Sequence, residues 1–153
     1  METPGLSADR RAYTARWTVR TYELDLNGHV NNAVYLNYAE QIATEHAEAI
    51  GFGRAWIAAQ GGGWVVRRHE LIYHQPALYG DELELTTRIE GMRGARGLRY
   101  TTITRVSDGT LLTDIHTEWV WVRASDGRPA RIPPALLSWL TPPEAGPHVN
   151  PDA

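Results

Sequence analysis

A short polar segment, residues 25–32, concentrates side chains that can take part in catalysis. It reads Asp-Leu-Asn-Gly-His-Val-Asn-Asn and directly precedes a predicted helix. The carboxylate of Asp25 can attack a carbonyl carbon or take a proton from water. The start of a helix carries unpaired N–H groups and a partial positive charge, which stabilise negative charge developing on a carbonyl oxygen. A carboxylate beside such a helix end is suited to acyl transfer.

The same segment also has a simpler, structural interpretation. Asp, Asn and Gly before a helix most often serve as capping and turn residues. His29 is equally consistent with a hydrogen-bonding bridge inside the turn and with a catalytic role. Residue types alone therefore favour a structural role for the segment over a catalytic one.

Two elements must position this segment, a strand before it and a long helix after it. Residues 13–24 are rich in β-branched and aromatic side chains, which is typical of a strand. After them, apolar residues recur at three- and four-residue spacing, which predicts a helix of about 18 residues ending at Gly51, with Asn31 or Asn32 as its N-cap. The apolar stripe of this helix consists of Leu36, Ala39, Ala43, Ala47 and Ile50.

Four further strands are expected after the helix, and they should pair as an antiparallel meander. They are predicted over residues 64–73, 81–90, 98–106 and 111–122. The pair Asp108-Gly109 marks a hairpin between the last two strands. A helix that is apolar on one stripe must lie on the sheet, so the order of elements predicts an α+β domain.

We expect this single domain to cover residues 13–140 and to end in a short helix over residues 131–140. The flanking residues 1–12 and 141–153 are polar and contain proline and glycine, which is typical of weakly ordered tails.

Composition excludes several classes of chemistry. The 153 residues include neither cysteine nor lysine, so disulfides, thiolate metal sites, Schiff bases and lysine-dependent phosphate loops are ruled out. The six histidines are scattered, and we expect no metal and no organic cofactor. A net charge of −3 argues against general nucleic-acid binding, and no apolar run approaches a membrane span. We therefore expect a cytoplasmic protein without a secretory leader, a nucleic-acid partner or a membrane partner.

Two segments resemble those of a known family. Residues 25–36 resemble the signature of hotdog-fold acyl thioesterases of the 4-hydroxybenzoyl-CoA thioesterase type. They are most similar to the form found in plant thioesterases that act on acyl carrier protein (ACP), Asp-x-Asn-x-His-Val-Asn-Asn-x-x-Tyr. Residues 73–81 are similar to the family's Tyr-x-x-Pro-Ala-x-x-Gly-Asp segment. The resemblance covers about residues 15–137 and implies a hotdog fold, in which an antiparallel five-stranded sheet wraps around one long central helix.

The resemblance also implies roles for individual residues. Asp25 matches the family's catalytic carboxylate, which acts as nucleophile or general base. Asn32 matches the position whose backbone N–H polarises the thioester carbonyl. Asn27 and His29 match residues that orient the reacting groups and assist proton transfer. Glu40 is the reserve catalytic candidate, because a second hotdog subgroup uses a helix carboxylate. Its other interpretation is an ion pair with an arginine or a hydrogen bond to the sheet.

Substrate contacts are expected at two places. We expect Tyr35, Leu36 and apolar residues of the strand over residues 64–73 to line a groove for the acyl chain. The turn within residues 91–99 carries three arginines, of which Arg93 and Arg96 match a basic loop that binds CoA phosphates in the family. A solvated charged turn is the alternative for each arginine.

The expected function is therefore hydrolysis of an acyl-CoA or acyl-ACP thioester by a homodimer or a dimer of dimers. A second hypothesis is a hotdog module that binds or senses acyl thioesters without hydrolysing them. A hotdog hydratase is a third, but the catalytic Asp/His segment of that class is not apparent in the sequence.

Overall fold

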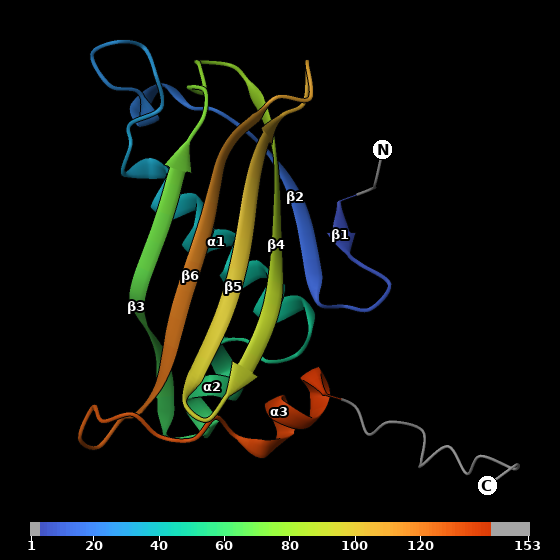
Figure 1. The fold of residues 1–153 in the computed structure, drawn as a ribbon, viewed down its shortest axis with the longest axis vertical. Coiled ribbons are helices and arrows are strands. Elements are labelled where there is room, and N and C mark those ends of the chain that lie inside the picture. Colours follow the sequence, from blue (N-terminus) through green and yellow to red (C-terminus); the bar gives the residue numbers. More distant parts are fainter. Residues whose placement is uncertain (1–3, 142–153) are drawn as a thin grey trace, which may run out of the picture.

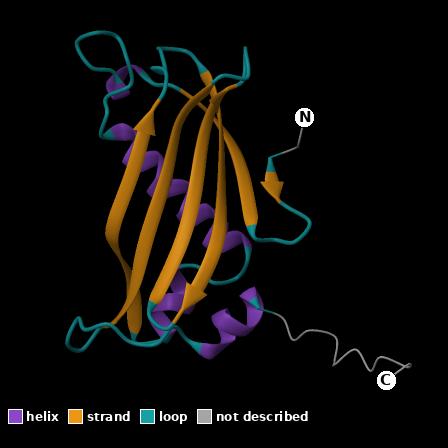
Figure 2. Cartoon of the chain, in the orientation of Figure 1, coloured by secondary structure: helices purple, strands orange, loops and turns teal. Residues whose placement is uncertain are grey.

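One antiparallel sheet with a long helix across one face makes up the body of the molecule (Figure 1). The computed structural model describes residues 4–141. The strands are β1 (Gly5–Leu6), β2 (Ala12–Thr18), β3 (Gly62–Tyr73), β4 (Glu82–Arg93), β5 (Arg96–Arg105) and β6 (Leu111–Arg123). The helices are the 3-10 turn η1 (Thr21–Glu23), α1 (Val34–Ala49), α2 (Arg54–Ala59) and α3 (Pro134–Leu140). Figure 2 shows α1 running behind the sheet, with α2 and α3 at one end of it.

The strand order is β1-β2-β4-β5-β6-β3, so the predicted meander of four consecutive strands is wrong for β3. Strands β4, β5 and β6 do form a meander, but β3 pairs with β6. The connection from β3 to β4 is too long for a tight hairpin and crosses the ends of the strands between them. His74 N–H donates to the Leu112 carbonyl at 2.8 Å, and Arg105 Nη2 donates to the Pro76 carbonyl at 2.9 Å.

The sheet has six strands, one more than the five predicted, because part of the N-terminal segment pairs with it. β1 is antiparallel to β2, with Gly5 opposite Thr14. A tight turn makes this possible: Ser7 N–H donates to the Ala12 carbonyl at 2.9 Å, and Arg10 adopts a left-handed conformation with φ 61. Of the two tails expected from the sequence, residues 142–153 lie outside the described residues.

The face of α1 that packs on the sheet is rotated relative to the predicted stripe. Leu36 and Ala47 are only half-buried, because larger side chains occupy the buried face. That face consists of Tyr35, Tyr38, Ala39, Ile42, Ala43 and His46. The side chains of the sheet that are fully buried with Ile42 in the same core include Leu83, Leu85, Ile103 and Ile115. A sheet wrapped around a long helix is the hotdog architecture that the sequence predicted.

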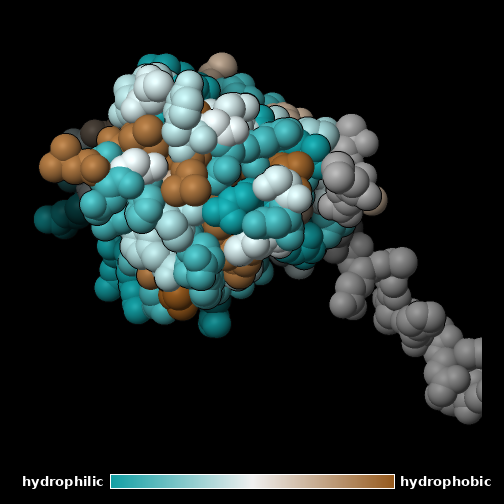
Figure 3. Space-filling model, turned by 90° about the horizontal axis from the view of Figure 1, so that it is seen from above, coloured by the Kyte–Doolittle hydropathy of each residue, from teal (hydrophilic) through white to brown (hydrophobic). Residues whose placement is uncertain are grey.

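A second apolar cluster closes the end of the sheet near α2 and α3. Trp121, Ile132 and Leu136 are buried there, and Phe52 and Trp56 pack against them. The sequence predicted α3 but not α2, which has six residues and no buried side chain. The opposite end of the molecule carries the loops at residues 24–33 and 74–81, and Figure 3 looks onto it. Figure 3 shows hydrophobic groups between hydrophilic ones on this end. Leu26, in the first of these loops, is fully exposed.

Candidate active site

The loop after η1 folds back on itself and holds the Asp25 carboxylate through its own backbone. Leu24 bridges Val30, and Asp25 N–H donates to the His29 carbonyl at 2.7 Å. Gly28 has φ 74, a conformation that favours glycine. Within this turn Asp25 Oδ1 accepts the N–H groups of Asn27, at 2.8 Å, and His29, at 3.1 Å. Oδ2 accepts no hydrogen bond from another described residue, so it is the oxygen left for chemistry.

An asparagine turn precedes the helix that follows. Asn31 and Asn32 were the predicted caps, but α1 begins at Val34 with Ala33 as its N-cap and without a side-chain cap bond. Asn31 Oδ1 instead accepts the Ala33 N–H at 3.0 Å, within the turn before the helix. Asn31 N–H donates to the Glu23 carbonyl at 2.8 Å, which joins the helix start to η1. Asn32 N–H has no acceptor among the described residues. Tyr73 Oη, at the end of β3, donates to the Asn32 carbonyl at 2.8 Å and fixes this residue in place.

The pairing of the loop brings the carboxylate to the helix start. Glu23 pairs with Asn31, Leu24 with Val30 and Asp25 with His29 along one short ladder. Across this ladder Asp25 lies opposite His29, five residues before the first residue of α1. The segment that leads into the positive end of α1 thus carries both a carboxylate oxygen and an Asn32 N–H without an acceptor among the described residues, the two kinds of group that acyl transfer uses.

The side chains of Asn27 and His29 make no hydrogen bond to another described residue. Asn27 is exposed, and its contact with Asp25 is made by its backbone N–H. His29 is half-buried, and its backbone bridges Leu78 in the loop between β3 and β4. Both residues thus contribute their backbone to the loop, and catalytic roles for their side chains stay predictions.

Tyr35 and Leu36 are both at least half-buried at the start of α1. Tyr35 is 2% exposed, and its hydroxyl accepts the Ala77 N–H at 3.1 Å. Burial raises the pKa of this hydroxyl. Leu36 is half-buried on the first turn of α1. Their contact with an acyl chain stays a prediction.

Glu40 lies on the exposed face of α1, and it forms no ion pair with an arginine of the described chain. Its charge acts on His69 of β3 and opposes the lowering of the pKa of that imidazole by burial. His69 Nδ1 lies 2.9 Å from Thr117 Oγ1. Glu40 thus faces the middle of β3, whereas Asp25 lies before the helix start.

Arg93 and Arg96 flank the hairpin between β4 and β5, in which Gly94 has φ 62. Arg96 Nε donates to Glu118 Oε1 at 2.8 Å, and Arg67 donates to the same oxygen at 3.2 Å. Both arginines, Arg96 first, lower the pKa of Glu118. Arg93 is exposed and has no carboxylate partner in the described part of the chain, so it is the more available of the two for a phosphate.

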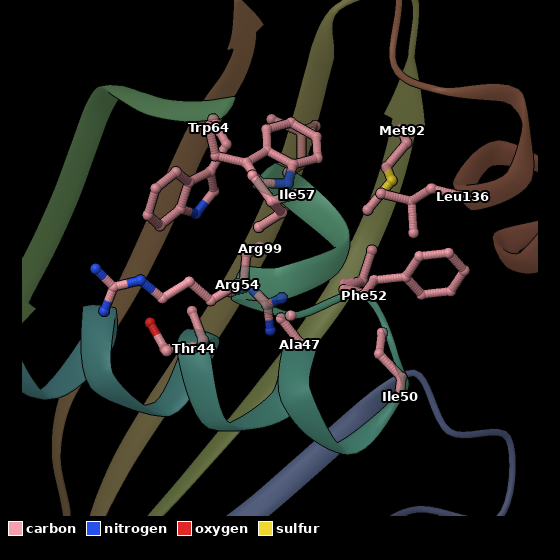
Figure 4. A pocket seen from close by; sticks show the side chains of 16 residues that line it. Thr44, Ala47, Ile50, Phe52, Arg54, Ile57, Trp64, Met92, Arg99 and Leu136 are labelled. Carbon is pink, nitrogen blue, oxygen red and sulfur yellow. The ribbon is translucent and has the colours of Figure 1, made fainter. Parts of the chain in front are cut away.

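A cavity of about 380 Å³ opens at the opposite end of α1 (Figure 4). Thr44 lines it ten residues after Val34, which places the cavity about 15 Å along the helix from its start. The walls combine α1, α2, α3 and the four strands β3, β4, β5 and β6. Their large apolar side chains include Phe52, Ile57, Trp64, Met92, Trp119 and Leu136. The sequence did not predict this site, because its walls come from seven separate elements.

Comparison with known proteins decides the family. Residues 19–140 match the family described as the Thioesterase-like superfamily. The chain belongs to this superfamily. The match covers most of the described domain and confirms both the predicted family and the hotdog fold.

Three members of the superfamily or its fold illustrate the similarity. The chloroplastic acyl-acyl carrier protein thioesterase ATL3 of Arabidopsis thaliana is 32% identical over 120 residues, which cover 78% of this chain and 63% of that protein. The long-chain acyl-CoA thioesterase FadM of Escherichia coli (strain K12) is 31% identical over 96 residues, 63% of this chain and 72% of FadM. The crystal structure of a hypothetical protein from Thermus thermophilus superposes with a TM-score of 0.76 at 27% identity, covering 84% of this chain and 96% of the other. This chain therefore spans less than two thirds of the Arabidopsis protein.

Two features are absent from the described residues. None of the helices is long and apolar enough to cross a membrane. No group of three or more His, Asp or Glu side chains in residues 4–141 is arranged to hold a metal ion.

Proposed function

We propose that this protein hydrolyses an acyl thioester of CoA or ACP to the free acid and the thiol. The observation that carries the proposal is the Asp25 carboxylate, which two backbone N–H groups hold through Oδ1. The same segment continues to Asn32, whose N–H has no acceptor among the described residues, and then to the start of α1. Membership of the superfamily and the thioesterase activities named for its Arabidopsis and E. coli members support the substrate class.

The chemistry needs only these groups and water. Asn32 N–H donates to the thioester carbonyl oxygen and stabilises the negative charge that develops on it. Asp25 either attacks the carbonyl carbon, expelling the thiolate and leaving an acyl anhydride that water cleaves, or removes a proton from the attacking water. In both routes the C–S bond breaks and one water is consumed. Its oxygen enters the acid, directly or by way of the Asp25 carboxylate, and its proton is transferred to the thiolate to give the free thiol. We propose no metal and no organic cofactor.

A panel of acyl-CoAs and acyl-ACPs, assayed by release of free thiol, tests this function. Turnover of at least one thioester that depends on Asp25 supports hydrolysis. Binding of acyl thioesters without thiol release would instead support the non-hydrolytic module, to which the free helix start would still offer a carbonyl site. A cytoplasmic location stays a prediction.

The edge strand β3 supports a dimer. It is twelve residues long, ends the sheet and exposes Val65, Ile72 and Tyr73 by 47%, 47% and 48%. The opposite edge strand, β1, has only two residues. A long, apolar, unpaired edge promotes association with another strand. We propose that two copies pair antiparallel through β3, as a homodimer or as the unit of a dimer of dimers.

This pairing would complete the site. Trp64, near the start of β3, lines the cavity, whereas Tyr73, at its end, holds Asn32. Antiparallel pairing brings the start of one β3 beside the end of the other. The cavity of one copy would then lie next to the Asp25 loop of the second copy, where an acyl chain attached to the reacting carbonyl can enter it.

Replacing Val65 and Ile72 together by Lys is expected to give monomers at micromolar concentration, since four like charges would face one another across the paired strands. Light scattering after size exclusion measures the mass, and thiol release should fall with it. The matched control is Leu6→Lys on the opposite edge, where a 36% exposed side chain is changed and the dimer should persist. A wild-type protein that is monomeric at this concentration would contradict the assembly.

Arg93→Ala combined with Arg96→Ala is expected to raise KM for acyl-CoA and to leave kcat nearly unchanged, because binding lost equally in ground and transition states acts on KM. Arg93→Ala alone should have the larger effect, since Arg96 is engaged by Glu118. The penalty should shrink at high salt. Arg88→Ala, which removes a surface ion pair with Asp9, is the control. An unchanged KM would assign both arginines to a solvated turn.

A further inference from the structure

Arg99 is a half-buried arginine without an acidic partner among the described residues. It lies in β5 between Ile89 of β4 and Thr117 of β6, and it lines the cavity. Its Nη1 donates to His46 Nδ1 at 2.9 Å and to Thr87 Oγ1 at 3.1 Å. Within residues 4–141 no carboxylate lies at ion-pair distance from it. Arg105 of the same strand, by contrast, pairs with the carboxylates of Asp81 and Asp108.

A charge removed from water without a counterion is costly, and proteins rarely keep one unless it has a partner. Burial lowers the pKa of the Arg99 guanidinium to about 10, so the group still carries its charge at neutral pH. Glu45, on the helix next to His46, does not compensate the charge, because its Oε2 is buried without any hydrogen-bond partner. An anion from outside the described residues would therefore stabilise the half-buried guanidinium.

His46 turns the remaining donors of Arg99 toward the cavity. Its Nε2 lies 2.8 Å from the Arg10 carbonyl, which can only accept, so the proton is on Nε2 and Nδ1 accepts from Arg99. The Nη1 donors are thereby occupied inside the protein. The fully enclosed, unpaired side-chain atoms of the described residues are Glu45 Oε2 and Thr113 Oγ1, so Arg99 Nε and Nη2 are not among them. Figure 4 shows Arg99 in the middle of the side chains that line the cavity.

The walls around this charge select the rest of the ligand. Trp64, Phe52, Ile57 and Leu136 present aromatic and aliphatic surface. A volume of about 380 Å³ falls within the range of ligand pockets. Gly97 leaves room for the Trp64 ring, which a Cβ would meet at 3.3 Å, so this wall is closely built. An anionic group is the complement of Arg99, and an apolar body is the complement of the walls.

We propose that this cavity binds a carboxylate on an apolar body, with the two carboxylate oxygens on Arg99 Nε and Nη2. A planar guanidinium matches a carboxylate in this bidentate way. Two sources offer this chemistry: a free apolar acid, or the far end of an acyl group that carries a second carboxylate. The second source rests on the proposed thioesterase function, whereas the first does not.

Calorimetry on the full chain with octanoate and 4-phenylbutyrate, each against its primary amide, tests the proposal without any turnover. At pH 7 the acids are expected to bind about 10- to 100-fold tighter than the amides, the range for hydrogen bonds to a charged group. The wild-type comparison needs no variant. Equal affinity of acid and amide would overturn the proposal.

Variants locate the interaction. Arg99→Met should remove the preference for the acid, and Arg99→Lys, which keeps the charge but not the fork, should retain part of it. Arg54→Met, at an exposed arginine that also lines the cavity, should leave most of the preference intact. Asp25→Asn should bind the acids as the wild type does, so loss of hydrolysis and loss of this site are separate results. A preference that survives Arg99→Met would assign binding elsewhere and overturn the proposal.

Turnover distinguishes the two sources. Comparison of acyl-CoAs ending in a methyl group with those ending in a carboxylate should show a lower KM for the second kind if the acyl end is bound, and Arg99→Met should cancel the difference. Equal KM values, with the acid preference retained in calorimetry, assign the site to free acids. Both results keep Arg99 as the anion-binding residue.

Discussion

Asp25→Asn is expected to lower kcat for thioester hydrolysis by about 10²- to 10⁴-fold, the range for losing general acid–base catalysis. The substitution replaces Oδ2, the oxygen without a protein donor, by an amide nitrogen that neither attacks nor accepts a proton. Oδ1 can still accept the N–H groups of Asn27 and His29, so the loop should keep its shape. Steady-state kinetics with the best thioester of the panel measures the effect, and KM and the melting temperature should change little.

Two further substitutions separate chemistry from structure. Asp25→Ala removes the two loop hydrogen bonds and should lower stability by about 0.5–2 kcal/mol, as loss of a cap-type contact does. Glu40→Gln is the matched carboxylate control, since Glu40 is exposed on α1 and should retain near wild-type kcat. An active Asp25→Asn with an inactive Glu40→Gln would transfer the catalytic role to Glu40. If both variants remain active, neither carboxylate performs the chemistry.

The Asp25 loop was predictable because its interactions are local. Every hydrogen bond that holds the Asp25 carboxylate spans two to four residues, and the bond from Ala33 N–H to Asn31 Oδ1 spans two. Turn chemistry of this kind is encoded by neighbouring residue types. The helix cap was predicted wrongly at Asn31 or Asn32, because the turn at Asn31 continues to Ala33 before α1 begins at Val34.

The position of β3 and the support of Asn32 are non-local and were missed. Periodicity identified β3 as a strand but carried no information on its partner, which is β6 rather than β4. The bond from Tyr73 to Asn32 joins residues 41 positions apart. Sequence patterns indicate which face of an element is buried. The order of the strands depends instead on the connection over residues 74–81, which crosses the ends of β5 and β6 before β4 begins.

The environment of Arg99 at the cavity also depends on contacts between residues far apart in the sequence. The sequence groups Arg99 with Arg93 and Arg96 between residues 91 and 99, where each arginine stands two positions after a glycine, although the strand predicted from residue 98 includes it. In the structure Arg99 lies inside β5 and is bonded to His46 from 53 residues away. The three arginines have three environments: Arg93 is exposed, Arg96 is paired with Glu118, and Arg99 is half-buried. The sequence carries no signal for the contact of Arg99 with His46.

His46 should make the protein sensitive to mild acid. The free energy of unfolding is expected to fall by about 3 kcal/mol between pH 6.5 and pH 4 from this residue alone. The side chain is fully buried, and burial together with the neighbouring Arg99 lowers its pKa from 6.5 to about 4. Protonation would place a second cation against the Arg99 guanidinium, whose donor would lose its acceptor on Nδ1.

The sign follows from proton uptake. Between pH 4 and pH 6.5 the unfolded chain binds a proton at His46 and the folded chain does not, so acid favours the unfolded state. The contribution is fully present above pH 6.5 and is lost as the pH falls toward 4. Burial lowers the pKa of His69 as well, which adds a trend of the same sign, whereas burial raises the pKa of Glu45 and adds the opposite trend.

Urea unfolding at a series of pH values, compared between wild type and His46→Gln, isolates the effect because His69 and Glu45 are common to both proteins. Gln can accept from Arg99 or donate to the Arg10 carbonyl but does not titrate, so the difference in unfolding free energy should shrink by about 3 kcal/mol from pH 7 to pH 4. Ile42→Ala is the matched control on the same buried face of α1, and it should cost about 2–5 kcal/mol at every pH. If the difference in unfolding free energy between wild type and His46→Gln stays constant across the series, His46 has an ordinary pKa in the folded protein. That result would contradict the neutral His46 imidazole that accepts from Arg99.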